Sequence, residues 1–373
     1  MTKVGKRSLV LLGVLLVACT DDDDYVAPLA DSGSADGSVA RDAGPSMDSS
    51  VTLDAALDTS APAPADAALP DAQVVNGSKL ALIERGRYLV ENLGACGDCH
   101  TPRNPNGSPN AALFLSGVDC FADAFPMDDA QGCLSSRNLT NHETGLKNRS
   151  DVEIKDMFLK GVRPDGTNLH PVMPYFVLGN MSAPDADAIV AFLRTVPPVE
   201  HMVKPAQAPF ANVPAPAPVW PDSLIPQPQL AYPNQAAALR GRYLAGSFGI
   251  CMECHSPRDQ AGLPIVTRAF EGGRAFGRDE LGLPPVFPQT IYSSNLTPDA
   301  TGIMGYDVPA IVGALKQGLD EQHKPLCPPM PAGPMGAFGG LSDADATDIA
   351  HYLLSLTPKA NTLPNECTPP GAP

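Results

Sequence analysis

Two short segments of this 373-residue sequence place a pair of cysteines directly before a histidine. The first reads Cys-Gly-Asp-Cys-His over 96–100, and the second reads Cys-Met-Glu-Cys-His over 251–255. This spacing is typical of covalent haem c attachment, because each thiol can form a thioether and the adjacent imidazole can bind the iron. We therefore expect two covalent haem c groups, attached through Cys96, Cys99, Cys251 and Cys254, with His100 and His255 as axial iron ligands.

The two motifs belong to an internal repeat. The segment Arg85–Leu89 recurs as Arg240–Leu244, at the same offset of 155 as the two cysteine motifs. Further matches follow in the same order, and the offset rises only to 160 where Ser182 matches Ser342. Matches in one order with a slowly drifting offset indicate a duplicated unit of about 120 residues.

Other uses of a Cys-x-x-Cys pair fit the sequence less well. A thioredoxin-like redox pair needs no histidine and is expected in a βαβ unit, which the sequence does not indicate. A zinc site could use both pairs, but these lie at matching places in two copies, so each copy is expected to form its own site. A disulfide within the motif would be strained.

The sixth iron ligand is expected to be a methionine, which completes a coordinatively saturated, high-potential centre. In the first copy the candidates are Met173, Met181 and His170, and Met173 lies in a Leu-x-Pro-x-Met-Pro segment that the second copy repeats. The same segment selects Met330 in the second copy, with Met335 as the alternative.

The elements that must position these residues are short helices. Pro and Gly number 41 and 33, which limits long helices and large sheets. No alternating run is long enough to predict a strand. Helical spacing of apolar residues instead predicts three helices in each copy, over 80–93, 151–162 and 184–195 and over 236–246, 307–318 and 342–355.

The N-terminus predicts export. A basic start and a short apolar run over 1–18 are typical of a signal peptide, and Leu16–Cys19 resembles the lipobox of bacterial lipoproteins. This resemblance implies a lipid anchor at Cys19 in the periplasm, and Thr20 resembles the signal for the outer membrane; an ordinary signal peptide is the alternative. Residues 19–78 hold twelve Asp and one Arg and are expected to be a disordered tether.

Composition predicts how residues 79–373 divide into domains and a linker. We expect one domain over 79–200, a Pro-rich linker over 201–233, a second domain over 234–360 and a tail over 361–373. The linker is predicted to be semi-rigid, because 197–233 contains eleven prolines. A net charge of −16 argues against nucleic acid as a partner.

The order of these motifs resembles class I cytochrome c domains. It is more narrowly similar to the multihaem cytochrome c subunits of membrane-bound alcohol, gluconate and fructose dehydrogenases. The resemblance implies an all-α fold of two tandem class I cytochrome c domains joined by the Pro-rich linker, with Met173 and Met330 completing the iron coordination. Those subunits commonly carry three haem motifs and a C-terminal membrane helix, whereas this chain has two motifs and an expected lipid anchor.

Four cysteines and four arginines complete the candidate residues. Exported thiols tend to pair, and pairing within each copy favours Cys120–Cys133 and Cys327–Cys367 among three connectivities. A guanidinium suits a haem propionate. The candidates are Arg87 and Arg242, or Arg103 and Arg258.

These features predict an electron carrier rather than an enzyme. Single electrons would pass from a donor such as a dehydrogenase to an acceptor cytochrome or oxidase, with no substrate pocket required. The alternatives are a di-haem peroxidase and a haem-based sensor, each of which requires one open iron. The repeated methionine disfavours the peroxidase, and the sequence shows no additional signalling module that a sensor would be expected to carry.

Overall fold

The computed structural model describes residues 71–364, except 106, 121–132, 208–209, 211–212, 214–216, 261, 280 and 282, together with Cys367; for 71–76 it describes the backbone alone. The expected signal peptide, the lipidation site at Cys19 and the tether up to residue 70 lie outside these residues. Residues 71–78 were expected to belong to the tether, but they form the start of the first helix, α1.

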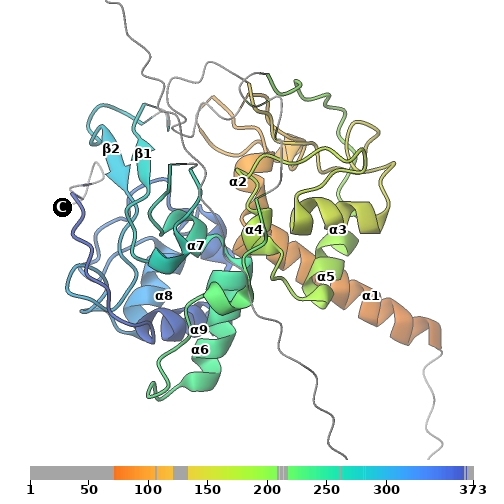
Figure 1. The fold of residues 1–373 in the computed structure, drawn as a ribbon. Coiled ribbons are helices and arrows are strands. Elements are labelled where there is room, and N and C mark those ends of the chain that lie inside the picture. Colours follow the sequence, from red (N-terminus) through yellow and green to blue (C-terminus); the bar gives the residue numbers. More distant parts are fainter. Residues whose placement is uncertain are drawn as a thin grey trace, which may run out of the picture. The chain divides into compact units, whose positions relative to one another are not determined.

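The described elements are helices and two short strands (Figure 1). The first copy contains α1 (Asp71–Tyr88), η1 (Leu89–Leu93), α2 (Cys96–His100), η2 (Ala111–Leu113), α3 (Asp151–Lys160), α4 (Tyr175–Leu178) and α5 (Ala183–Leu193). The intervening segment and the second copy contain η4 (Asp222–Leu224), α6 (Gln235–Arg242), η5 (Tyr243–Phe248), α7 (Cys251–Cys254), η6 (Val266–Arg268), β1 (Ala275–Gly277), β2 (Thr290–Tyr292), α8 (Val308–Gln317), η7 (Ala337–Gly340) and α9 (Asp343–Leu354). Across this part of the chain, none of the helices combines the length and the apolar character needed to cross a membrane.

All six predicted helical segments are helical, and local sequence signals explain their ends. Ser150 and Glu153 form a capping box at the start of α3, and α3 and α8 each stop at a glycine in the left-handed conformation. Ser182 and Ser342 cap α5 and α9 through their hydroxyls, which accept from the backbone N–H three residues later. The two copies therefore use similar stop and start signals.

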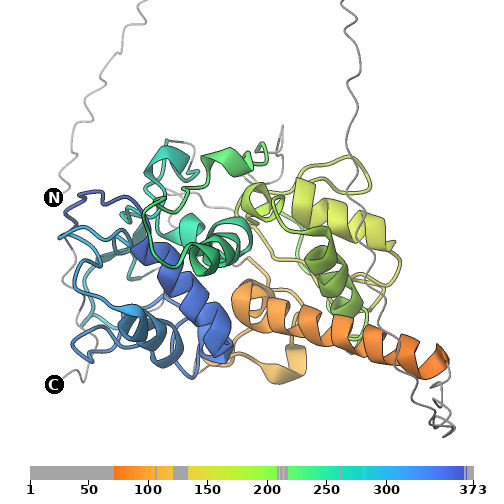
Figure 2. The same ribbon diagram turned by 90° about the horizontal axis from the view of Figure 1, so that it is seen from below.

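The terminal helices of each copy cross at a glycine. Figures 1 and 2 show α1 beside α5 and α6 beside α9. A Cβ atom at Gly86 would lie 1.9 Å from the carbonyl oxygen of Ala188, and one at Gly241 would lie 1.9 Å from that of Asp348. Only glycine permits so close an approach of two backbones. This explains the glycine of the repeated Arg-Gly-x-Tyr-Leu segment.

The prediction of an all-α fold is wrong. Strands β1 and β2 form a two-stranded antiparallel sheet, with Phe276 opposite Ile291. Among the described residues of the first copy, the corresponding place has a single bridge, between Val118 and Ser136. Each strand has three residues, of which only the middle one is buried, so no alternating pattern was available to predict it.

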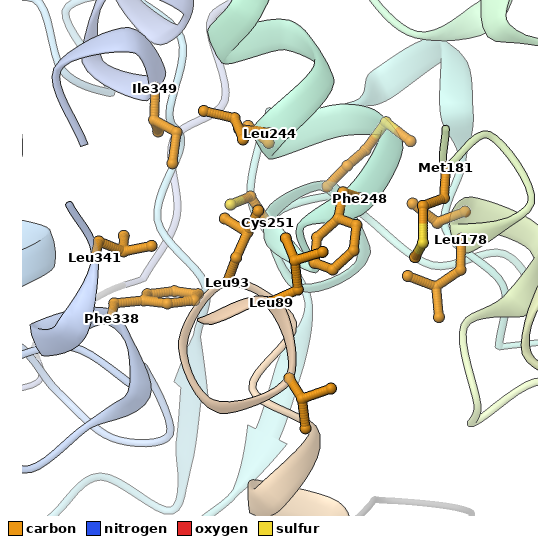
Figure 3. Close-up of a cluster of buried hydrophobic side chains, with 14 of the residues drawn as sticks. Leu89, Leu93, Leu178, Met181, Leu244, Phe248, Cys251, Phe338, Leu341 and Ile349 are labelled. Carbon is orange, nitrogen blue, oxygen red and sulfur yellow. The ribbon is translucent and has the colours of Figure 1, made fainter. Parts of the chain in front are cut away.

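The prediction of two tandem class I cytochrome c domains is also wrong, because the two copies share one core. All described residues belong to one compact unit. A single apolar cluster contains Leu89 and Leu93 of the first copy together with Phe248, Cys251 and Phe338 of the second (Figure 3). A fully buried large apolar side chain contributes roughly 1.5–3 kcal/mol, so separating the copies would be costly.

Two tyrosines join the copies reciprocally. The Tyr88 hydroxyl donates to Asp345 in α9, and the Tyr243 hydroxyl donates to Asp185 in α5, each over 2.7 Å. Each hydroxyl also accepts from the backbone N–H of the serine that caps the same helix, over 3.2 and 3.1 Å. The tyrosine of the repeated segment therefore binds the last helix of the other copy.

The Pro-rich segment packs against both copies and does not hold them apart. Trp220 is buried against Phe176 of the first copy, with ring centroids 4.8 Å apart. The backbone N–H of Trp220 also donates to the Phe176 carbonyl. Further along, the N–H of Gln229 donates to the carbonyl of Ser355, at the end of α9 in the second copy. Apolar side chains among the prolines, such as the buried Ile225, explain this packing.

Candidate functional site

The two cysteine motifs occupy equivalent short helices. Helix α2 carries the first motif and follows the π-helix η1, while α7 carries the second and follows the π-helix η5. Cys96, Cys99, Cys251 and Cys254 are free thiols. The remaining four described cysteines form the two expected bridges within the copies, Cys120–Cys133 and Cys327–Cys367.

Burial keeps the four motif thiols protonated in the absence of a bound group. It raises the pKa of Cys96, Cys99 and Cys251 to about 12 and that of Cys254 further still. A catalytic redox cysteine needs a lowered thiol pKa, so a thioredoxin-like pair is not supported. The described residues contain no group of three or more His, Cys, Asp and Glu side chains that could hold a metal ion.

A large cavity reaches both motifs. Its volume is about 1510 Å³, beyond the roughly 300–1,000 Å³ of ordinary small-ligand pockets. Of the predicted site residues, the cavity is lined by Cys96, Cys99, His100, Met173, Cys254, Met330 and Met335. Cys251 and His255 are both buried but do not line it. The structure thus brings together a complete predicted set in the first copy and part of the set in the second.

Both motif histidines are oriented by a backbone carbonyl. Nδ1–H of His100 donates to the carbonyl of Arg137, and Nδ1–H of His255 donates to that of Ser294, each over 2.8 Å. This hydrogen bond fixes the tautomer and leaves Nε2 able to bind a metal. Burial lowers the pKa of both imidazoles, which keeps them in the neutral, metal-binding form.

The carbonyls are held in place by the repeated Asn-Leu-Thr segment that follows them. Asn138 comes directly after Arg137 and donates to Thr144 Oγ1 and to the Val199 carbonyl, each over 2.9 Å. Asn295 makes the corresponding hydrogen bonds in the second copy, over 3.0 and 2.7 Å. Sequence reasoning noted this repeat but gave it no role; its recurrence beside each motif was the available signal.

The candidate sulfur ligands occupy different environments. Met173 and Met330 are half-buried, pack against the apolar cluster and line the cavity. Met181 also lines the cavity but is buried within the cluster, and Met335 is 92% exposed. His170 accepts from the backbone N–H of the nearby Val172, which occupies its Nδ1. Burial and position therefore favour Met173 and Met330.

The predicted propionate partners are engaged by protein carboxylates. Arg87 pairs with Glu84, Arg242 with Asp222, Arg103 with Asp98 and Arg258 with Glu253. Arg103 lines the cavity, whereas the other three predicted arginines do not. Sequence reasoning missed three further arginines that line it, and no repeat marks them: Arg137, Arg163 and Arg274.

The residues fit haem c. Thiols, a neutral imidazole with its Nε2 available and a thioether lie around a cavity that is mostly apolar. This is the donor set that haem c requires: two thioether bonds, a histidine and a methionine. The His100 hydrogen bond carries the fit, because it prepares the nitrogen that would bind iron.

The chain is similar to dehydrogenase subunits, among them cytochrome c subunits. It is 29% identical over 297 residues to the gluconate 2-dehydrogenase cytochrome c subunit of Pantoea cypripedii, an alignment that covers 75% of this chain and 60% of the relative. It is 28% identical over 299 residues to a subunit of nicotinate dehydrogenase from Pseudomonas putida, covering 78% and 22%. A diheme cytochrome c-type protein of Cereibacter sphaeroides is 27% identical over 191 residues, covering 48% and 59%.

These similarities confirm the resemblance found in the motifs. The chain spans less than two thirds of the length of the relatives just described. No family model matches the chain.

Proposed function

We propose that this chain is a di-haem c-type cytochrome that carries single electrons between a dehydrogenase and a downstream acceptor. The observation that carries the proposal is the cavity that reaches both Cys-x-x-Cys-His motifs, with a histidine oriented for iron at one end of each motif. Similarity to cytochrome c subunits supports the same function.

The chain's own residues would hold two haem c groups. Cys96 and Cys99 would form thioethers in the first copy, with His100 and Met173 as axial ligands. In the second copy the corresponding residues are Cys251, Cys254, His255 and Met330. Haem c supplies an iron that takes up and releases one electron. The mostly apolar walls of the cavity would limit access of water to the haem, and two protein ligands at each iron would leave no position for a substrate.

The sequence supports a proposed anchor, and the relatives support proposed partners. We propose that the chain is exported and bound to the outer membrane through a lipid at Cys19. Three relatives are named as parts of nicotinate, gluconate and alcohol dehydrogenases, so we propose a dehydrogenase as the electron donor. An acceptor cytochrome or oxidase would take the electrons, and this chain would be the electron-transfer partner rather than the catalytic one.

The test is a haem count followed by carbon monoxide. The full chain is produced in a host that attaches haem c, and the covalent haem per chain is measured. We expect two, and we expect no spectral change when carbon monoxide is added to the reduced protein, because both irons are already six-coordinate. A change in about half of the haem would indicate one open iron and favour the peroxidase or sensor alternative.

Matched variants separate the two sites. Replacing both Cys96 and Cys99 by Ser, or both Cys251 and Cys254, should leave one haem per chain. M173A should make one site open to carbon monoxide, whereas M335A should not. Absence of covalent haem in the unmodified chain would overturn the proposal.

A further inference from the structure

A buried cluster of three charged side chains lies at the second motif. Glu253, inside the motif, forms ion pairs with Arg274, over 2.5 Å, and with Arg258. Glu253 and Arg274 are 8% and 9% exposed. Burial alone would raise the pKa of Glu253, but Arg274 and Arg258 hold it below its usual value. These ion pairs join two cations to one anion.

The Arg274–Glu253 pair lies at the second motif and lines the cavity that also reaches the first motif. Nη1 of Arg274 lies 3.7 Å from Sγ of Cys254. Arg274 and Glu253 also line the cavity together with Cys99 of the first motif. The pKa of the Cys99 thiol is raised to about 12, mainly by burial and also by Asp98 and Glu253, while Arg274 and Arg103 act in the opposite sense. The pair is thus within electrostatic reach of an attachment cysteine in each copy.

The described residues of the first copy do not form a matching cluster. Its acid at the corresponding motif position, Asp98, is 37% exposed and lies 3.8 Å from Arg103, which is 52% exposed. The backbone N–H of Arg274 donates to Ser293 Oγ as that of Val118 donates to Ser136 Oγ, so the first copy has the uncharged Val118 at the place of Arg274. Both copies therefore carry a Cys-x-x-Cys-His motif, but the buried arginine at position 274 stands in the second copy alone.

Stability does not account for this arrangement. Removing charges from water costs several kcal/mol per ion, and a buried ion pair is often no more stabilising than apolar residues of the same volume. In a medium of low polarity, however, a fixed charge acts strongly over several ångströms. A positive charge favours the reduced form of any nearby redox centre, because that form carries one positive charge fewer.

We propose that Arg274 is a buried cation that raises the reduction potential at both iron sites at once. This inference rests on the proposed function. Arg258, which pairs with the same carboxylate but does not line the cavity, acts at the second site alone. Glu253 acts in the opposite sense to Arg274.

The experiment is a redox titration of the haem-loaded full chain, fitted to two one-electron components. R274Q removes the shared cation and leaves Glu253 paired with Arg258, so no buried carboxylate loses all of its partners. We expect both components to move to lower potential. R274K keeps the charge and should restore both towards the unmodified values, and R258Q should move one component only.

Glu253→Gln provides an independent arm with the opposite sign, and it keeps the inference testable if R274Q fails to fold. Both components should then rise. A shift in only one component with R274Q or E253Q, or no shift, overturns the inference. Failure of the proposed function gives a different result, since the unmodified chain would then lack two covalent haems before any arginine is changed.

Discussion

The two copies orient their motif histidines in the same way, but their disulfides lie at different places around the two sites. In both, a histidine donates to a carbonyl over 2.8 Å, and an asparagine holds the turn that contains this carbonyl. The disulfides have no such correspondence. Cys133 lies four residues before Arg137, on the histidine side of the first site, whereas Cys327 lies three residues before Met330 and its carbonyl accepts from the Met330 N–H.

This difference separates two kinds of residue. Those that the repeat preserves, such as Asn138 and Asn295, form the ligand geometry that both sites share. Those that it does not preserve, such as the disulfide cysteines, set what distinguishes one site from the other. Two sites of equal geometry can therefore differ in rigidity and in electrostatic environment.

The largest expected effect is the loss of a disulfide. The bridge Cys327–Cys367 closes 40 residues of chain and Cys120–Cys133 closes 13. Loop-closure entropy predicts that replacing each pair by alanine lowers the free energy of unfolding by about 4 and about 3 kcal/mol, respectively. Denaturant unfolding of the haem-loaded variants measures both.

The same variants test which axial iron ligand each disulfide holds in place. Loss of Cys327–Cys367 should also open one iron to carbon monoxide, because the Met330 segment is loosened. Loss of Cys120–Cys133 should leave both irons closed. An equal response from both variants would contradict the asymmetry.

The second effect should be equal in the two copies. G86A and G241A each place a methyl group 1.9 Å from a carbonyl oxygen of the crossing helix. Overpacking of this kind costs roughly 1–3 kcal/mol or more, and we expect a similar loss of unfolding free energy for both. Gly77 is the control, since a Cβ there meets no atom within 4 Å; G77A should be neutral or stabilising by up to about 1 kcal/mol.

Much of this molecule could be predicted from residue types and spacing. The helix starts near Ser182 and Ser342 follow from capping signals. The two disulfides follow from the expectation that exported cysteines pair and that each pair lies within one copy. The shared core could not be predicted. The helical spacing of Leu89 and Leu93 indicates that one face of the segment is buried, but it does not indicate which copy covers it.

The same limit applies to single residues. Tyr88 and Tyr243 are visible in the repeat, but their partners lie in the opposite copy, which no pattern within one unit reveals. The strands were missed because three residues are too few to show a period of two. Arg274 was missed because a residue present in only one copy resembles any surface arginine until its burial is known.

The third effect tests the reciprocal contact between the copies. Y88F and Y243F each remove a hydroxyl that donates to an aspartate over 2.7 Å and accepts from a capping serine. A hydrogen bond to a charged group contributes about 1.5–3 kcal/mol, and because these contacts are only partly buried, each variant should lose about 1.5 kcal/mol of unfolding free energy. Tyr232 offers a control near α9: its hydroxyl bonds His351 of its own copy, so Y232F should not affect contact between the copies.

The smallest effect concerns acid. The carboxylate of Asp185 binds Arg85 over 2.8 and 3.0 Å and accepts from Tyr243. Burial opposes ionisation, but Arg85 and Tyr243 prevail and hold the pKa of Asp185 below its usual value. A lowered folded-state pKa means that this stabilisation is fully present above the unfolded-state pKa, near 3.9, and is lost as the pH falls through the folded-state value.

D185N should therefore unfold more easily than the unmodified chain at pH 7, by about 0.5–1 kcal/mol, since the Arg85 partner is partly exposed. The difference should narrow below about pH 4 and vanish at still lower pH, because the unmodified carboxyl is then protonated as well. Unfolding free energies at pH 7, 5, 4 and 3 measure this. R85Q removes the same ion pair, so its unfolding free energy should approach that of the unmodified chain over the same pH range. A difference that stays constant with pH would mean that Asp185 stabilises the contact between the copies through its shape and not through its charge.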